Sequence, residues 1–153
     1  MQIDIRIQEQ DFSLQAETDL LRSVASDTGA LVTFTGLVRD FSEGKQVHGL
    51  YLEHYPGMTQ RSLEAIAAEA AGRWPVHAVT IIHRTGRLDA GQQIVFVGVS
   101  STHREAAFSA CQFLMDYLKT RAPFWKKSYS PDGEYWVEAK ESDVQASDRW
   151  QDS

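Results

Sequence analysis

The sequence predicts an α+β fold with a mainly antiparallel sheet, two long helices and a C-terminal hairpin. Segments rich in β-branched and aromatic residues occur in pairs, and two long segments with helical spacing separate these pairs. A Ser-Pro-Asp-Gly turn at residues 130–133 lies between the last two strand-like segments. The chain has 153 residues, of which 42% are hydrophobic. Residues 1–153 are therefore expected to form a single domain with a buried core.

The predicted strands rest on alternating or β-branched apolar residues. Ile3, Ile5 and Ile7 alternate with polar residues, which is typical of a half-buried strand. The other predicted strands are residues 30–39, 48–55, 76–86 and 92–101, followed by the hairpin pair 124–129 and 134–139. Strands that are neighbours in the sequence are expected to pair, so residues 30–39 should pair with 48–55 across a polar loop at 40–46.

Helices are predicted from apolar spacing at residues 17–25, 58–74 and 103–121. The second and third are the two long helices. Thr59 and Thr102 are expected to cap their first turns. Pro75 and Pro123 are expected to end them, because proline cannot continue a helix.

Charge and cysteine content limit the function classes. The net charge of −6 disfavours binding to nucleic acid or anionic lipid over the whole surface, so an anion site must be local. Cys111 is the single cysteine, so no internal disulfide or cysteine-only metal site is expected, and a reducing compartment, the cytoplasm, is favoured. The chain shows no signal-peptide pattern and no apolar run near the roughly 20 residues of a membrane span. Residues from about 140 to 153 are expected to be a loosely held tail.

One candidate anion site is the segment Ser100-Ser101-Thr102-His103-Arg104, where a predicted strand passes into a predicted helix. Free N–H groups and the helix dipole favour an anion at a helix start, and the side chains of His103 and Arg104 add donors. A basic pair in the first turn opposes the dipole, so helix stability gives no reason for it. The alternative is a solvated pair without a function.

A second candidate is residues 119–127, KTRAPFWKK, with four cations and no acidic residue between them. Cations in the last turn of a helix are also favoured by the dipole alone. Lys119, however, borders the apolar stripe expected of this helix, formed by Phe108, Cys111, Met115 and Leu118. An amine at such an edge is partly desolvated, which favours the neutral form that acts as a nucleophile or general base.

The length of the third predicted helix separates these two candidates. At 1.5 Å per residue, His103 and Arg104 lie roughly 22–24 Å from Lys119. A small substrate cannot touch both groups within one chain. Either they are two sites, or a two-fold dimer brings the helix start of one chain beside the helix end of the other.

Other residues give weaker signals. Gly36 permits close approach to a strand, and Arg39 at the exit of that strand suits a phosphate or carboxylate. Cys111 is expected to be an inert core thiol. The histidines lack the spacing of metal ligands with an acidic partner, so no metal site is expected.

Five motifs in the chain are similar to those of one family. They are VTFTGLVRD at 32–40, LEHYPGM at 52–58, RWP at 73–75, IVFVGVSSTHR at 94–104 and FLMDYLKTRAPFWKK at 113–127. They follow the order and spacing of the family from about residue 30 to 150, with WVEAKESD at 136–143 included. The chain resembles the large, catalytic subunit of molybdopterin synthase.

This resemblance implies an α/β-hammerhead fold and a homodimer. Each subunit would bind a small ubiquitin-like sulfur-carrier protein, giving a heterotetramer. The C-terminal Gly-Gly thiocarboxylate of the carrier would supply two sulfurs to cyclic pyranopterin monophosphate (precursor Z). The product is the dithiolene of molybdopterin, in molybdenum cofactor biosynthesis. Because the sulfur comes from the partner, no cofactor or catalytic cysteine is expected.

The resemblance also implies the site residues. It makes Lys119 the essential lysine and Lys126 a second pocket lysine. Substrate contacts would come from these two and from Leu37, Val38, Arg39, His103, Arg104, Lys127 and Ser128. Phe34, Met115 and Lys140 would belong to the pocket wall. Ser128 stands where the family pattern has an acidic residue and Lys140 where it has arginine, so the contacts available at these two positions differ.

Two other function classes use the same residues. A non-catalytic dimer that binds a phosphorylated ligand needs the anion site but does not need a reactive Lys119. The effect of Lys119→Ala on turnover therefore separates it from an enzyme. An RNA-binding module is disfavoured by the net charge, and a steep salt dependence of RNA affinity would revive it.

Overall fold

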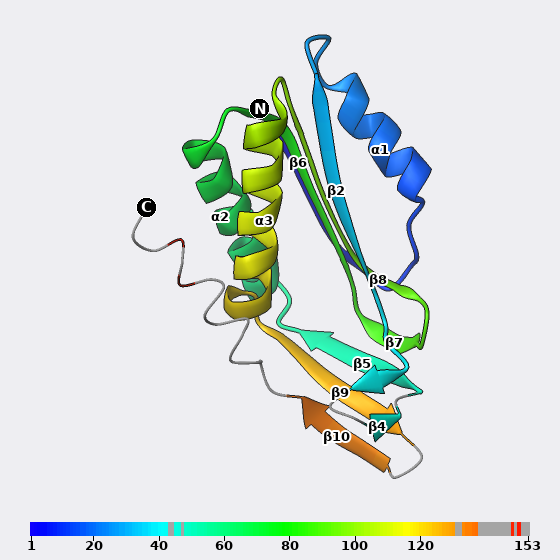
Figure 1. Cartoon of the computed structure of the whole chain (residues 1–153). Coiled ribbons are helices and arrows are strands. Elements are labelled where there is room, and N and C mark those ends of the chain that lie inside the picture. The colour runs from blue at the N-terminus through cyan, green and yellow to red at the C-terminus, as the bar shows by residue number, and fades with distance from the viewer. Residues whose placement is uncertain (43–44, 47, 131–132, 138–147, 149, 151–153) are drawn as a thin grey trace.

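Two four-stranded sheets, a two-stranded ribbon and three helices form the part of the chain that the computed structural model describes, which is residues 1–42, 45–46, 48–130, 133–137, 148 and 150 (Figure 1). The first sheet has the strand order β1 (Gln2–Gln8), β6 (Val76–Arg84), β8 (Gln93–Ser101), β2 (Ala30–Leu37). The second has the order β10 (Gly133–Val137), β9 (Phe124–Ser130), β5 (Gly49–His54), β7 (Gly86–Asp89). The ribbon consists of β3 (Phe41–Ser42) and β4 (Lys45–Gln46). The helices are α1 (Leu14–Ser23), α2 (Met58–Arg73) and α3 (Arg104–Arg121). The predicted α+β class is confirmed.

The first sheet is covered on both faces, by α2 and α3 on one side and by α1 on the other (Figure 1). Alternate residues of a strand point to opposite faces. Val79 and Ile81 of β6 accordingly lie in the core shared with α2 and α3. Ala78 and Ile82 pack with Leu21 of α1. Burial on both faces explains why β6 and β8 are apolar along nearly their whole length.

The second sheet lies at one end of the first, next to the C-terminal end of α3 (Figure 1). β7 follows β6 after a turn at Gly86, whose φ of +81° suits a residue without a Cβ. α3 passes into β9 through Ala122 and Pro123. The predicted hairpin is confirmed, because β9 and β10 pair antiparallel. This arrangement brings the end of α3 and the start of β9 together.

The predicted pairing of residues 30–39 with 48–55 is wrong. β2 pairs antiparallel with β8, whereas β5 pairs with β7 and β9 in the other sheet. The reason is that β8 is buried on both faces and needs a hydrogen-bonded neighbour at each edge. The polar loop predicted at 40–46 contains the β3–β4 ribbon, and the strand predicted at 76–86 ends at Arg84. β1 pairs parallel with β6, the one parallel pair among the described strands.

Local hydrogen bonds set the start of α1 earlier than predicted, whereas α2 begins at Met58 as predicted. α1 begins at Leu14, three residues before the predicted start, because the Ser13 hydroxyl accepts from the Ala16 N–H at 3.2 Å and caps the first turn. The prediction that Thr59 caps α2 is wrong, since the N-cap is Gly57 with φ +84°. Thr59 is fully buried, and its hydroxyl donates to the carbonyl of Pro123 at 3.1 Å. The start of α2 is thereby tied to the start of β9.

Trp150 docks on the helical layer. Its ring packs edge-on against Trp74 and Phe113, and its Nε1–H donates to Asp116 at 2.6 Å. The tail predicted at about 140–153 otherwise falls on residues outside the described part, apart from residue 148. No helix among the described residues is long and apolar enough to cross a membrane.

Candidate active site

The corner between β8 and α3 presents two basic side chains. β8 ends at Ser101, and His103 is the N-cap of α3, so the predicted cap Thr102 is wrong by one residue. His103 makes no side-chain capping hydrogen bond. His103 and Arg104 are both exposed beside the free N–H groups of the first turn. The corner therefore has the donors and the polarity that an anion requires.

The opposite end of α3 carries Lys119. The helix is unbroken over 18 residues, so Arg104 and Lys119 lie about 22 Å apart at 1.5 Å per residue. Figure 1 shows α3 running along the first sheet and ending at the second. The geometric premise drawn from the sequence is confirmed: one small ligand cannot reach both ends of this helix.

Lys119 is exposed in the single chain. The apolar stripe predicted beside it is present at Cys111 and Leu118, which are buried, and at Met115, which is half-buried. Phe108 is 62% exposed, so the prediction that it belongs to a covered stripe is wrong. The desolvation that the sequence suggested for the Lys119 amine is therefore not supplied by one protomer.

β9 places Lys126 near the same end of α3. Phe124, Lys126 and Ser128 share one face of the strand because side chains alternate. Lys126 is half-buried and pairs in register with Leu52 of β5. Ser128 is fully buried, and its hydroxyl has no hydrogen-bond partner among the described residues. Lys127 lies on the opposite face of the strand from Lys126.

His83 lies close enough to both lysines for their charges to act on its ring. Its ring is buried and stacks on Phe124, with ring centroids 3.8 Å apart and an angle of 17° between the planes. Burial lowers the pKa of His83 to about 4, and the charges of Lys126, His54 and Lys119 act in the same direction. The Nδ1 atom lies 2.9 Å from the Arg84 carbonyl, which opposes this shift by favouring a protonated Nδ1. The ring is therefore neutral at pH 7, with the proton on Nδ1 and a lone pair on Nε2.

Arg121, the third cation of the predicted cluster, has a packing role. Its guanidinium lies 3.7 Å from the centroid of the Tyr117 ring and donates to Glu69 of α2 at 3.1 Å. It joins the ends of α2 and α3. Of the four cations, Lys119 and Lys126 act on His83 through their charges, Arg121 packs between the two helices, and Lys127 lies on the opposite face of β9 from Lys126.

The segment Leu37-Val38-Arg39 follows β2. Val38 is 3% exposed, and its N–H and carbonyl bond to Gln92 and Gly91 at 2.9 and 2.7 Å. Val38 thus fixes the segment, whereas Leu37 and Arg39 are exposed. The predicted wall residue Phe34 is 39% exposed on β2. Lys140, also predicted for the wall, lies outside the described residues.

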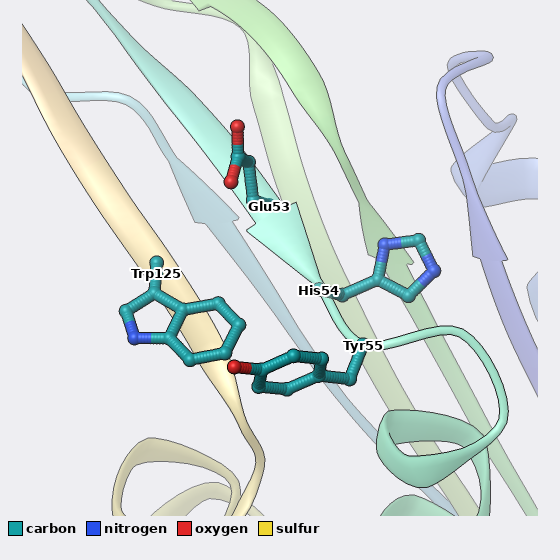
Figure 2. A pocket seen from close by; sticks show the side chains of 4 residues that line it. All are labelled: Glu53, His54, Tyr55 and Trp125. Atoms are coloured by element: carbon teal, nitrogen blue, oxygen red, sulfur yellow. The ribbon is translucent and has the colours of Figure 1, made fainter.

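An open pocket of about 530 Å³ lies between the end of β5 and the start of β9 (Figure 2). Glu53, Tyr55 and Trp125 line one side, and the rings of Tyr55 and Trp125 meet edge-on at 4.2 Å. Figure 2 shows the His54 ring pointing away from Glu53. Glu53 and Trp125 are register partners and lie on the face of the strand pair opposite Lys126. His54 also lines the pocket and lies on the Lys126 face, so the pocket borders the lysine side of the strand pair as well.

The thiol and the acidic groups offer little other chemistry. Cys111 is buried, and burial raises the pKa of its thiol to about 11, so the expectation of an inert core thiol is confirmed. Among the described residues, no group of three or more His, Cys, Asp or Glu side chains is arranged to hold a metal ion.

Sequence reasoning missed His83 and Phe124. The histidine was set aside because it has no ligand spacing, yet it shares the face of Val79 and Ile81, which cover the α3 side of the sheet. The alternation of side chains along residues 76–84 could therefore have predicted that His83 faces α3. The stacking on Phe124 was not readable, because the two residues are far apart in the sequence and meet only through the α3–β9 corner.

Comparisons with known proteins agree with this geometry. A family model described as MoaE protein matches residues 7–121, about three quarters of the chain. This chain belongs to the MoaE family.

Curated relatives in the MoaE family carry the name molybdopterin synthase catalytic subunit. The one from Pseudomonas aeruginosa is 53% identical over 97% of this chain and 99% of its own. The one from Escherichia coli is 57% identical over 92% of this chain and 93% of its own. The fold is similar to that of the molybdopterin biosynthesis MoaE protein from Burkholderia ambifaria, with a TM-score of 0.83, 52% identity and 98% of each chain covered.

The MoaE match covers most of the candidate site. Residues 7–121 include the corner at His103 and Arg104, the buried His83 and Lys119. The match ends before Lys126, which the longer alignments with the curated relatives reach. The resemblance inferred from five motifs is thus confirmed at the level of the family.

Proposed function

We propose that this chain is the catalytic subunit of a molybdopterin synthase and transfers sulfur to cyclic pyranopterin monophosphate. The sulfur comes from the C-terminal Gly-Gly thiocarboxylate of a small ubiquitin-like carrier protein, and the product is the dithiolene of molybdopterin. The observation that carries the proposal is that the end of α3 and the start of β9 place Lys119 and Lys126 where both charges act on the buried, neutral His83. It occurs in a chain whose relatives named as this catalytic subunit are more than 50% identical over nearly its full length.

The charge of the site suits this reaction. A thiocarboxylate and a cyclic phosphate are both anions, so they repel each other unless positive charge lies between them. The amines of Lys119 and Lys126 supply that charge and stabilise the negative charge that develops as sulfur adds and the cyclic phosphate opens. His83 is neutral at pH 7, so its ring packs against Phe124 and adds no positive charge to that of the two lysines.

The complete site is proposed to belong to a homodimer. His103 and Arg104 clamp the substrate phosphate at the Lys119 end of the other protomer, because α3 is too long for one chain to use both ends. β2 is an edge strand of the first sheet, and its Phe34 and Leu37 are 39% and 56% exposed. Phe108 on α3, which packs against β2, is 62% exposed. A second copy over this surface would cover these apolar side chains.

A small partner subunit follows from the same proposal. The relatives are named as the catalytic subunit of a synthase, which implies at least one other subunit. We propose that two carriers and two copies of this chain form a heterotetramer in the cytoplasm. The carrier tail would reach the exposed Lys119 amine at the end of α3, where the second sheet begins.

The decisive experiment replaces Lys119 by alanine. Sulfur transfer from a thiocarboxylated carrier to cyclic pyranopterin monophosphate is expected to fall by at least about 100-fold, because a charged group at the reacting atoms is lost. Carrier binding and the dimer should persist, since Lys119 is an exposed residue outside the core. Turnover near the wild-type rate would exclude Lys119 as the catalytic group and favour a non-catalytic binding module.

Arg121→Ala is the matched control. It removes a cation two residues further along the same helix, where the side chain packs on Tyr117 and pairs with Glu69. A lower melting temperature with retained sulfur transfer is expected. Equal losses of turnover in the two variants would mean that net charge alone, and not the position of Lys119, governs the rate.

A further inference from the structure

Three polar side chains from three different elements meet behind the corner that carries His103 and Arg104. The Thr102 hydroxyl donates to Asp27, with 3.2 Å between Oγ1 and Oδ2. The Nε2 atom of His77 lies 3.1 Å from the same hydroxyl oxygen and 3.4 Å from Oδ1 of Asp27. Because a hydroxyl has one proton and Thr102 gives it to Asp27, Nε2 must carry a proton and act as the donor. The three groups therefore form a consistent chain of hydrogen bonds.

A β-bulge aims His77 at this cluster. The register of β6 against β8 shifts between Val76 and Ala78, so His77 is the extra residue of the bulge. A bulge re-aims a side chain at the cost of local ladder bonds. Val76 pairs with Ser101 at the very end of β8. The irregularity is thus located where the strand passes into the corner.

The backbone at Gly29, just before β2, lies in direct contact with the backbone of the corner. The Gly29 N–H donates to the Ser101 carbonyl at 3.0 Å. A Cβ atom on Gly29 would lie 2.2 Å from the carbonyl oxygen of Thr102, which is a clash with backbone. On the inner side of the corner, the Ser101 hydroxyl bonds the carbonyl of His103. The corner is therefore held from the loop, from β6 and from its own turn.

We propose that Asp27, His77 and Thr102 are positioning residues that hold the β8–α3 corner so that His103 and Arg104 face the substrate phosphate. This inference rests on the proposed function for the identity of the anion. We call Asp27, His77 and Thr102 the corner anchor, and its existence rests on the hydrogen bonds described above. His103 has no side-chain cap, so the direction of the basic pair depends on the backbone of the corner and not on bonds of the pair within the helix.

The anchor acts on binding more than on chemistry. The lysines of the same chain lie at the other end of α3, about 22 Å away, and those beside the basic pair in the proposed dimer belong to the other protomer. Loosening the corner therefore weakens the hold on the phosphate and leaves the lysine pair unchanged. An interaction made equally in the ground and transition states appears in KM and not in kcat.

The test replaces Thr102 by valine, which keeps the shape and removes the hydroxyl. Two readouts are taken on the full chain: amide hydrogen exchange of the first turn of α3, and KM and kcat for cyclic pyranopterin monophosphate with the thiocarboxylated carrier. Loss of one such hydrogen bond is expected to speed exchange and raise KM by about five-fold each. kcat should change by less than about two-fold. Thr102→Ser, which restores the hydroxyl, should recover the wild-type values.

Ser23→Ala is the matched control, because the Ser23 hydroxyl donates to the carbonyl of Leu20 within α1 and not to the corner. It should leave exchange at the corner and KM unchanged. A His77→Ala and Thr102→Val double variant should be no worse than the single variants, since both changes break the same chain of bonds.

Each outcome decides one part of the proposal. Unchanged exchange in Thr102→Val would overturn the anchor. Faster exchange with unchanged KM would overturn its role in positioning the basic pair. A wild-type protein without sulfur transfer would refute the proposed function instead, and the exchange data would still decide whether the anchor exists.

Discussion

At the scale of single residues, the burial of His83 is expected to make the stability of the fold depend on pH. Its pKa of about 4 in the folded chain lies below the ordinary value of 6.5, because the ring is buried. Between these two values the unfolded chain binds the proton and the folded chain does not. Stability is therefore expected to fall as the pH drops from about 6.5 to about 4, by up to the order of 3 kcal/mol, and to level off below that range.

His83→Phe tests this origin of acid sensitivity. Phenylalanine keeps a ring against Phe124 and cannot be protonated, so the slope of the unfolding free energy over this pH range should become shallower. Urea unfolding at a series of pH values measures it. His48→Gln removes an exposed histidine and should leave the slope unchanged. An identical slope in His83→Phe and in the wild type would show that other groups cause the acid sensitivity.

The residue scale also shows what a pattern leaves open. The sequence pointed to Lys119 through the helical stripe beside it, and the structure places Lys119 in that last turn. The sequence could not show that Lys119 is exposed, because exposure depends on how the other elements pack around the end of α3. Lys126 and Lys127 are adjacent in the sequence, but strand alternation places them on opposite faces of β9.

At the scale of elements, α1 is held to the first sheet through Gly98. A Cβ atom there would lie 2.5 Å from Cδ1 of Leu21 and 2.8 Å from the Phe96 ring. Both side chains are fully buried, so neither has free space to move into. The glycine therefore sets how closely α1 packs on β8.

Gly98→Ala is expected to lower the unfolding free energy by about 1–3 kcal/mol, because the added methyl group overpacks this interface. Thermal or urea unfolding measures the loss. kcat and KM should stay near wild type, since Gly98 faces α1 and the lysine pair lies on the other side of the sheet. A wild-type melting temperature would mean that Leu21 and Phe96 can repack at no cost.

Element boundaries were predicted well where local chemistry decides them. The two long helices and the β9–β10 hairpin are present, because apolar spacing, proline and a Gly-containing turn act within a few residues. Strand partners were not predictable in the same way. β2 joins β8 although β5 is nearer in the sequence, because β8 requires neighbours at both edges.

At the scale of the whole molecule, the distance between the two ends of α3 predicts that each active site of the dimer uses residues from both protomers. If each site takes its lysines from one protomer and its basic corner from the other, two inactive variants can complement each other. A heterodimer of Lys119→Ala and Arg104→Ala contains one site without either substitution. It should recover about half of the wild-type activity per dimer.

Co-expression with two different tags isolates this heterodimer for the sulfur-transfer assay. The control pairs Lys119→Ala with Lys126→Ala, whose substitutions both lie near the C-terminal end of α3. Every site of that heterodimer is damaged, and no recovery is expected. If the first heterodimer is as inactive as the control, each site lies within one protomer, and His103 and Arg104 do not act with the lysines.

The sequence by itself determined the α+β class, the long helices, the family and the separation of the two basic groups along α3. The class, the helices and the separation follow from periodicity, turn chemistry and residue spacing, which are local properties of the chain, and the family follows from the resemblance of five motifs. Only the tertiary structure decided which strands pair, which side of β9 each lysine occupies, and that His83 is buried within reach of the charges of Lys119 and Lys126. It also brought Asp27, His77 and Thr102 together behind the corner. These contacts join residues far apart in the chain that only folding brings together, so local patterns of the sequence do not predict them.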